Sequence, residues 1–352
     1  MAETNALKML ILGLTGECNF MCSYCYADRH PQGRMSLDTA TRAIAMAAGG
    51  GKPFVLQFSG GEPLLAFDVL REIADNVRLN GVPAIMQVQT NASLIDRRIA
   101  EYLRDARIGV GISLDGRPDQ NDALRRLPSG AGTSRLILRG AGALAAAGAE
   151  IGITCVVTAD NVRQLPGIVE MAYYLGNVRK IGFDLLRAQG RGAGLSPADA
   201  RNLEAALRQV LATARRLEGQ TGRKLLFSHA ARVESLAGKN VDGFAHCHAM
   251  NGEAAFVDAS GEIYACASLA GFPEFRLGNV KDGIDPCKQR AVGAMVRKSM
   301  RFCPACPSFA LCGGGCFARW YGGGSEGRPH LPECALKSVF IREYLERKER
   351  AV

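Results

Sequence analysis

The sequence has no apolar run that approaches the ~20 residues a membrane-spanning helix needs. The longest candidate, residues 144–157, is interrupted by Glu150. The chain also lacks an early segment in which basic residues precede an apolar stretch and a cleavage site, the pattern of a secretory signal. We therefore expect a cytoplasmic protein without a membrane partner.

Charge of one sign is not concentrated anywhere along the chain. The 43 Lys and Arg residues outnumber the 34 Asp and Glu residues, which gives a formal net charge of +9, but they form no basic block. Basic residues on solvated helix faces explain this even distribution of charge. Binding of an anionic peptide or cofactor is the lesser alternative explanation. No basic stretch is interleaved with aromatic residues, so we expect no nucleic-acid partner.

Cysteine, in contrast, is plentiful and clustered. Of the 12 cysteines, Cys18, Cys22 and Cys25 form a CxxxCxxC pattern behind the apolar run 9–14. In a chain without an export signal, such clusters favour metal binding over disulfides. Three thiolates can ligate three irons of a 4Fe–4S cube and leave one iron open for substrate chemistry. Zinc is the alternative, but zinc sites prefer paired CxxC units with a fourth ligand nearby.

The first ~230 residues alternate short apolar runs with longer helical patterns, a βα rhythm. The predicted strands are 8–14, 54–58, 84–89, 109–114, 151–157 and 180–186. The predicted helices are 36–48, 68–79, 96–104, 134–147, 162–175 and 197–217. For the last helix, Ser196 is the expected N-cap and Pro197 the first helical residue. Six βα units predict an α/β fold whose parallel sheet curls toward a barrel.

Polar residues follow four of the predicted strands. The cysteine triplet follows the first strand and the SGGEP turn at 59–63 follows the second. Residues 89–91 follow the third strand, and 113–116 close the fourth. Chemistry in such barrels lies on the loops after the carboxyl ends of the strands. The four clusters therefore predict a single mouth.

After residue ~240 the helical periodicity fades, while glycine and cysteine become more frequent. A series of seven cysteines follows the order C, GxxxxC, CxxCxxxxxCxxxC, C. Its members are Cys247, Cys266, Cys303, Cys306, Cys312, Cys316 and Cys334. A predicted helix at 335–350 ends the chain. Two zinc sites are again the alternative reading of this series.

Two of these patterns together resemble the radical S-adenosylmethionine (radical SAM) superfamily: CxxxCxxC with Tyr24 before its last cysteine, and the Gly-Gly-Glu-Pro turn at 60–63. The seven-cysteine series resembles the SPASM extension of radical SAM peptide-modifying enzymes. The stretch 247–280 is most similar to maturases that install thioether crosslinks in ribosomal peptides. The resemblance implies a partial (β/α)6 TIM-like barrel at 1–230, a SPASM domain with a bridging region at 231–334 that binds two iron–sulfur clusters, and a C-terminal helix at 335–352.

The resemblance also implies the cofactors. S-adenosylmethionine binds the open iron of the cluster at the cysteine triplet and is cleaved to a 5′-deoxyadenosyl radical. Glu62 is expected to pair with the methionine ammonium, and Ser113 and Asp115 with ribose hydroxyls. Gln89 is expected to line the same mouth. The predicted cofactor-binding residues are Tyr24, Gly60, Gly61, Glu62, Thr90, Asn91, Ser113, Asp115 and Arg125. The family usually has a histidine where this chain has Asn121.

Two auxiliary 4Fe–4S clusters are implied by the family's pattern. Cys303, Cys306, Cys312 and Cys334 hold one of them. The other is held by Cys247, Cys266 and Cys316, which leaves either an open iron or a fourth ligand from outside the pattern. The candidates for that ligand are Cys287, His246 and His248, although Cys287 has the character of a bystander thiol at a helix start. Cys155, in the middle of a strand, is expected to pack in the core.

The implied function is post-translational modification of a peptide by hydrogen abstraction, with thioether formation as one form. Other radical peptide chemistry is the alternative: carbon–carbon or carbon–oxygen crosslinks, residue excision, cofactor maturation or sulfatase-type formylglycine formation. Sulfatase-type enzymes are less similar, because they usually carry an aspartate where this chain has Ala267. A non-catalytic zinc or electron-transfer module is the rival class.

The resemblance further implies a peptide substrate and a reductant such as flavodoxin or ferredoxin. Because the first strand begins near residue 8, we expect a leader peptide to be read by a separate protein or by the surfaces of the barrel and the SPASM domain.

Overall fold

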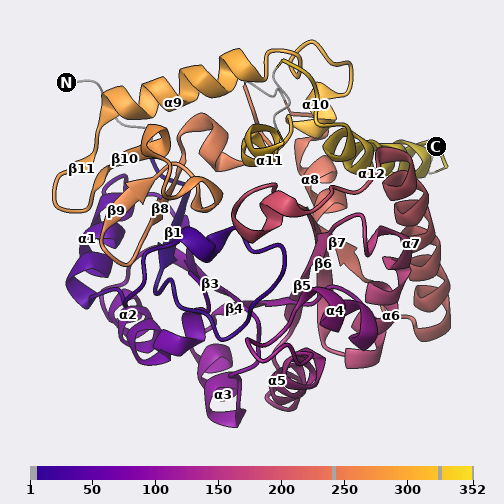
Figure 1. Ribbon diagram of the computed structural model, residues 1–352, viewed down its shortest axis with the longest axis horizontal. Coiled ribbons are helices and arrows are strands. Elements are labelled where there is room, and N and C mark those ends of the chain that lie inside the picture. The colour runs from indigo at the N-terminus through magenta and orange to yellow at the C-terminus, as the bar shows by residue number, and fades with distance from the viewer. Residues whose placement is uncertain (1–5, 240–242, 324–326, 351–352) are drawn as a thin grey trace.

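The computed structural model describes residues 6–239, 243–323 and 327–350; residues 1–5, 240–242, 324–326 and 351–352 of the predicted regions lie outside this description. Its first part is a parallel sheet with helices along the outer side (Figure 1). All six predicted strands are present and each pairs in parallel with the next. They are β1 (Met9–Gly13), β2 (Phe54–Ser59), β3 (Ala84–Thr90), β4 (Gly109–Ser113), β5 (Ile151–Val157) and β6 (Val178–Leu185), and β7 (Leu226–Phe227) follows at the edge. The predicted α/β class is confirmed.

The predicted helices of this part are also present. They are α1 (Leu37–Ala48), α2 (Phe67–Leu79), α3 (Arg97–Asp105), α5 (Ser134–Ala146), α6 (Pro166–Leu175) and α7 (Ala200–Thr221). The short helices α4 (Pro118–Leu124) and α8 (Ser228–Leu236) lie outside the predicted set. Single 3-10 turns are η1 (Ala27–Arg29), η2 (Pro63–Ala66), η3 (Val162–Gln164) and η4 (Gly190–Gly194). The predicted helix 162–175 is divided into η3 and α6, because Pro166 is the first residue of α6 and has no N–H to continue the turn before it.

The predicted start of α7 is wrong by three residues. The helix begins at Ala200, and its N-cap is Asp199 rather than Ser196. The Asp199 carboxylate accepts from the backbone N–H groups of Arg201 and Asn202, both at 3.0 Å. A single carboxylate thus satisfies two of the free N–H groups of the first turn, which a serine hydroxyl three residues earlier cannot reach.

The part of the chain after residue 240 continues the same sheet instead of forming a separate one. Strand β8 (Ala254–Val257) pairs in parallel with β1. Strands β9 (Glu262–Tyr264), β10 (Arg276–Asn279) and β11 (Gly283–Ile284) then add antiparallel ladders. The predicted division at residue 230 falls inside α8. The two predicted regions therefore share one hydrogen-bonded sheet.

The helices of the C-terminal part cross from one edge of the parallel sheet to the other (Figure 1). The 3-10 turns η5 (His248–Asn251), η6 (Ala267–Leu269) and η7 (Pro273–Phe275) precede α9 (Pro286–Ser299), α10 (Phe309–Cys312), α11 (Phe317–Gly322) and α12 (Leu331–Glu349). The last helix packs against α7 and α8 near the β6–β7 edge. With β8 on β1 and α12 on α7, the C-terminal part touches both ends of the partial barrel.

The two faces of the parallel sheet differ in chemistry. Leu10, Leu12 and Leu56 are fully buried. Alternate positions carry Gln57 and Gln87, whose side chains bond each other at 2.7 Å (Nε2 to Oε1) and line a cavity that spans β2 to β6. A polar, incompletely filled inner face leaves room for a bound molecule, unlike the packed interior of a closed barrel.

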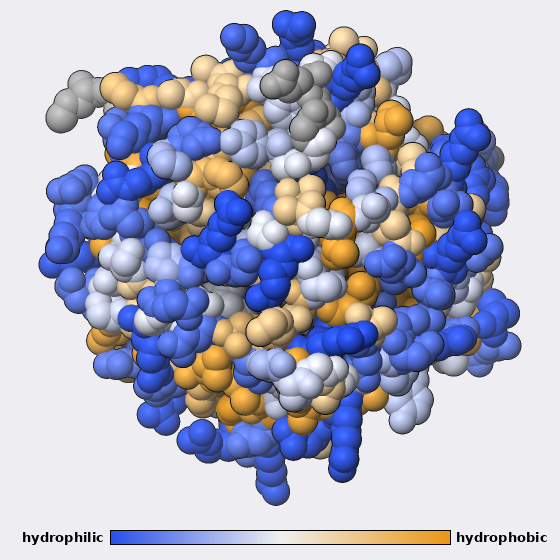
Figure 2. Space-filling view, in the orientation of Figure 1, coloured by the Kyte–Doolittle hydropathy of each residue, from blue (hydrophilic) through white to orange (hydrophobic). Residues whose placement is uncertain are grey.

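Hydrophilic residues are spread around the rim of the face shown in Figure 2, without gathering over one element. No helix in the described ranges is long and apolar enough to cross a bilayer.

Replacing Asp199 by Ala should lower the free energy of unfolding by ~1 kcal/mol, because α7 loses its N-cap acceptor. Denaturant unfolding of the metal-loaded protein under argon measures the change. Ser196→Ala is the matched control, since Ser196 lies outside the helix. Equal losses in the two variants would contradict the assignment of the cap.

Candidate functional site

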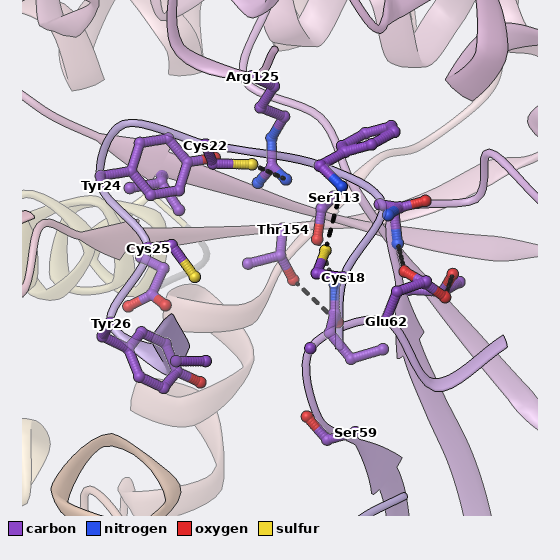
Figure 3. A pocket seen from close by; sticks show the side chains of 18 of the residues that line it. Cys18, Cys22, Tyr24, Cys25, Tyr26, Ser59, Glu62, Ser113, Arg125 and Thr154 are labelled. Atoms are coloured by element: carbon purple, nitrogen blue, oxygen red, sulfur yellow. Dashed lines mark hydrogen bonds between the residues drawn. The ribbon is translucent and has the colours of Figure 1, made fainter. Parts of the chain in front are cut away.

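A cavity opens at the carboxyl ends of the parallel strands, where the sequence predicted one mouth. The loop after β1 lines it, together with residues that close β2 to β6. Figure 3 shows the sulfurs of Cys18, Cys22 and Cys25 turned toward a common space within it. The other predicted site residues on its wall are Tyr24, Gly60, Gly61, Glu62, Thr90, Asn91, Ser113 and Arg125.

Neighbouring segments hold the cysteine loop from two sides. The backbone N–H of Met21 donates to the carbonyl oxygen of Arg126 at 2.7 Å. On the other side, Arg191 donates from its backbone N to the carbonyl of Cys25 and from Nε to the carbonyl of Cys22, both at 2.9 Å. Protein contacts alone therefore fix the loop that presents the three thiols.

Cys22 is the buried member of the triplet. Burial raises the pKa of its thiol, and the charge of Arg125 acts in the opposite direction. The Nη1 atom of Arg125 lies 3.9 Å from Cys22 Sγ. A guanidinium in this position stabilises the thiolate, which is the form that ligates metal.

Glu62 is a fully buried carboxylate on the cavity wall. It accepts from Thr90 Oγ1 at 2.6 Å, from the backbone N of Asn91 at 2.7 Å and from the backbone N of Leu64 at 3.0 Å. Burial raises the pKa of Glu62, while these hydrogen bonds lower it. The predicted residues Thr90 and Asn91 thus hold Glu62 in place as well as lining the cavity.

The two glycines of the turn after β2 are needed for a close approach of backbone to backbone. Gly60 has φ +141°, and a Cβ there would lie 2.2 Å from the carbonyl oxygen of Thr15. A Cβ at Gly61 would lie 2.1 Å from the carbonyl oxygen of Glu17. Besides lining the cavity, these glycines thus let the turn pack on the segment that leads into Cys18.

Asp115 does not lie where the sequence placed it. Its side chain is fully buried behind the cavity wall and accepts from the Tyr24 hydroxyl, from Arg125 Nε at 2.8 Å and from the backbone N of Val156 at 2.8 Å. With both oxygens occupied, the expected contact with ribose hydroxyls is not supported. Asp115 instead positions Tyr24 and Arg125, whose guanidinium carbon lies 5.3 Å from the centre of the Tyr24 ring.

Asn121 holds the turn that carries Asp115. It is fully buried, and its Oδ1 accepts from the backbone N of Asp115 at 3.2 Å. Its Nδ2 donates to the hydroxyls of Thr133 at 3.2 Å and Ser134 at 3.0 Å. The amide therefore fixes the turn after β4, at the position where the family usually has a histidine.

Ser113 lines the cavity together with Gln89 and Thr154. Gln89 donates from Nε2 to Ser113 Oγ at 3.0 Å and accepts from Thr154 Oγ1 at 3.3 Å. All three residues line the cavity and supply it with hydroxyl and amide groups suited to a sugar.

The wall nearest the C-terminal part carries residues that the sequence reasoning missed. Asp184 lies within the end of β6 and Arg187 just after it. The two side chains pair at 2.6 Å (Nη1 to Oδ2) and line the cavity. Arg187 lies over the ring of Tyr26, with its guanidinium carbon 4.9 Å from the ring centre. Burial opposes ionisation of Asp184, but Arg187 and Arg319 lower its pKa to about 2. The available signal was a charged residue near the end of the predicted strand 180–186, Asp184, and a second one directly after it, Arg187.

The seven later cysteines gather in the two predicted sets. Cys303, Cys306, Cys312 and Cys334 line one cavity, which Cys316 also borders. Cys247, Cys266 and Cys316 line a second cavity whose other described lining residues are apolar: Ala249, Met250, Ala265, Leu269, Val292, Val296, Phe317 and Ala318. Cys155 is fully buried in the core.

None of the three expected fourth ligands lies at the second cavity. His246 lines a different cavity beside Cys312, with its Nε2 atom 3.7 Å from Glu333 Oε1. His248 faces Glu253 at 3.3 Å (Nδ1 to Oε2). Cys287 is exposed and accepts from Arg290 Nη2 at 3.2 Å. Within the described chain, the cavity of Cys247, Cys266 and Cys316 thus offers three thiols and no fourth donor.

The donor type of the three cysteine sets bears on what they could hold. The cysteines of an iron–sulfur cube each ligate a separate iron through a thiolate. Sets made of thiols alone fit iron–sulfur ligation.

Comparisons with known proteins agree with this site. A family model described as "Radical SAM superfamily" matches residues 12–172. An uncharacterized protein of Methanocaldococcus jannaschii, MJ0907, is 33% identical over 281 residues, which cover 79% of this chain and 90% of that one. The cysteine-type anaerobic sulfatase-maturating enzyme of Clostridium perfringens is 25% identical over 342 residues, 88% of each chain. The Fe-coproporphyrin III synthase of Methanosarcina barkeri is 32% identical over 189 residues, but the match spans only 45% of its length.

Solved structures show the same fold at lower identity. Native anSMEcpe with bound AdoMet and the Cp18Cys peptide has a TM-score of 0.79 and 22% identity, with 98% of each chain covered. Streptococcus suis SuiB bound to S-adenosylmethionine has a TM-score of 0.69 and 17% identity, covering 93% of this chain and 77% of SuiB.

Replacing Asp115 by Ala should lower the free energy of unfolding by about 3–5 kcal/mol, because Arg125 is left as an unpaired buried charge. Denaturant unfolding measures the loss. Glu150→Ala, which breaks an exposed ion pair with Arg179 (2.7 Å), is the control and should change much less. Stability equal to that of the unmodified protein in Asp115→Ala would refute the role assigned to this pair.

Proposed function

Since the chain belongs to the radical SAM superfamily, we propose that it cleaves S-adenosylmethionine reductively and uses the radical to form a thioether in a peptide. The single observation that carries the peptide chemistry is the cavity with three thiols and an otherwise apolar described lining. The radical step itself rests on the cysteine triplet and the cavity around it.

The residues of the main cavity fit S-adenosylmethionine and its cluster. The three thiols of the triplet are the donor type that iron–sulfur clusters require. Glu62 offers a buried carboxylate, held by three hydrogen bonds, to the methionine ammonium. Ser113 and Gln89 offer polar groups to the ribose. When bound, the cluster would supply the electron for reductive cleavage of S-adenosylmethionine to methionine and a 5′-deoxyadenosyl radical.

The protein's task in the radical step is to position and protect. The Tyr24, Asp115 and Arg125 network fixes the loop that carries Cys22. The cavity is recessed among the ends of five strands, which keeps a reactive carbon radical away from solvent. The electron comes from a reductant such as flavodoxin or ferredoxin.

Thioether formation accounts for the cavity of Cys247, Cys266 and Cys316. Three thiols leave one iron of a cube without a protein ligand among the described residues. With a cube bound there, a substrate cysteine would bind the open iron as a thiolate, because binding to a metal removes its proton. The new carbon–sulfur bond would replace one C–H and one S–H bond: the hydrogen atom would go to the 5′-deoxyadenosyl radical, the proton to solvent and the remaining electron to the cluster.

A second candidate function is radical chemistry on a tetrapyrrole side chain. It is favoured by the 32% identity to the Fe-coproporphyrin III synthase, which exceeds the 25% identity to the sulfatase-maturating enzyme. The match to the synthase, however, covers 53% of this chain, while the match to the sulfatase-maturating enzyme covers 88%. We rank the peptide first because Cys247, Cys266 and Cys316 line a cavity whose other described lining residues are apolar, which suits the thiol of a substrate cysteine.

Cys22→Ala should abolish formation of 5′-deoxyadenosine from S-adenosylmethionine and dithionite, because one ligand of the radical cluster is lost. Chromatography of the anaerobic reaction measures the product. Cys287→Ala is the matched control, since its thiol is exposed and lies outside all three sets; it should react as the unmodified protein does. Normal turnover by Cys22→Ala would sink the proposal.

The metal content of the loaded protein tests whether the cysteine sets hold clusters. The loaded protein should hold ~11–12 irons per chain, and two or three zincs instead would support a non-catalytic module.

Cys316→Ala should lose up to about four irons, keep 5′-deoxyadenosine formation, and give no crosslinked peptide. Mass spectrometry of a cysteine-rich peptide encoded beside the protein should show the loss of two hydrogens per crosslink. Conversion of Fe-coproporphyrin III, with no change in the peptide, would favour the second candidate.

A further inference from the structure

Five charged side chains, three of them buried and two partly buried, alternate in sign between the main cavity and the C-terminal cysteines. We call this set the charge chain: Lys337, Glu333, Arg319, Asp184 and Arg187. Lys337 Nζ lies 3.6 Å from Glu333 Oε1. Arg319 forms ion pairs with both Glu333 and Asp184, and Asp184 pairs with Arg187 at 2.6 Å. The side chains of Lys337, Glu333 and Arg319 are only 4–7% exposed.

The two ends of the charge chain are cations, and each lies at a different site. Arg187 lines the main cavity. Lys337 lines the cavity of Cys303, Cys306, Cys312 and Cys334. Its ammonium donates to the carbonyl oxygens of Gly314 and, at 3.4 Å, of Cys312.

The charge chain is not neutral within itself. It contains three cations, Lys337, Arg319 and Arg187, and two anions, Glu333 and Asp184. Arg319 and Arg187 are matched by the two carboxylates. Glu333 Oε1, the carboxylate atom nearest Lys337, makes no hydrogen bond with any described group. An excess buried positive charge is costly unless an anion lies beside it, and thiolates that hold an iron–sulfur cluster provide that anion.

We propose that Lys337 raises the reduction potential of the auxiliary cluster held by Cys303, Cys306, Cys312 and Cys334. The proposal rests on the proposed function, which supplies the cluster. Reduction adds one negative charge to the cluster, and a buried cation nearby stabilises that charge in a medium of low dielectric constant. Glu333, the residue before Cys334, acts in the opposite direction. The reduction potential of this cluster thus depends on two opposing charges, the ammonium of Lys337 and the carboxylate of Glu333.

The experiment is a potentiometric titration of the loaded protein, with dithionite as the source of electrons and electron paramagnetic resonance as the readout. Lys337→Met should shift one auxiliary signal to lower potential and leave the signal of the Cys18, Cys22 and Cys25 cluster unchanged. Glu333→Gln, which keeps the shape and removes the charge, should shift the same signal to higher potential. Opposite shifts cannot come from a general loosening of the site.

Two further variants keep the test decisive. Lys348→Met, at an exposed lysine of the same helix α12, removes the same charge and should shift nothing. Lys337→Gln keeps a donor for the carbonyl of Gly314 without the charge, and it replaces Lys337→Met if that variant loses iron. Full iron content with unchanged potentials in Lys337→Gln and Glu333→Gln would overturn the proposal.

This outcome is separate from the failure of the proposed function. All of these variants keep the cysteine triplet and should form 5′-deoxyadenosine. A protein without any iron–sulfur signal would refute the proposed function itself.

Discussion

The pairing of β1 with two neighbours is the constraint on which both cysteine regions depend. Backbone hydrogen bonds join β1 to β2 on one side and to β8 on the other. The cysteine triplet leaves the end of β1, Cys247 precedes β8, and Cys266 follows β9, the antiparallel partner of β8. Because adjacent strands lie about 4.8 Å apart, sheet geometry rather than a flexible linker sets the separation of the cysteine triplet from Cys247 and Cys266.

Buried ion pairs of Arg319 hold the C-terminal part at the opposite edge of the sheet. Arg319 lies in α11, behind Cys316, and binds Asp184 at the end of β6 as well as Glu333 beside Cys334. Loss of any one partner leaves a buried charge without compensation, which is strongly destabilising. The C-terminal part is thereby fixed against the far edge of the partial barrel, and Arg187 and Tyr26 are held between the main cavity and the auxiliary cysteines.

Much of the fold follows from local sequence, because a buried parallel strand is a continuous apolar run and its helix is amphipathic. Chain geometry also brings together polar groups that end neighbouring strands, so Glu62 and Ser113 were placed correctly in one cavity. Tertiary partners decide the rest. Asp115 has the same short polar character as Ser113, yet Tyr24 and Arg125 turn it away from the cavity. The pairing of β1 with β8 joins residues that are about 240 positions apart in the sequence, and no local sequence pattern predicts it.

The acid–base character of the cavity bears on which bond is formed. Two of the described lining residues carry a carboxylate. Glu62 is held by three donors, and Asp184, with a pKa of about 2, is a weak base. Burial raises the pKa of Tyr26 to about 12, so its phenol stays protonated. Glu62, whose pKa burial raises, is therefore the stronger base of the two. The thioether chemistry proposed above needs neither carboxylate, because a cysteine thiol loses its proton on binding iron.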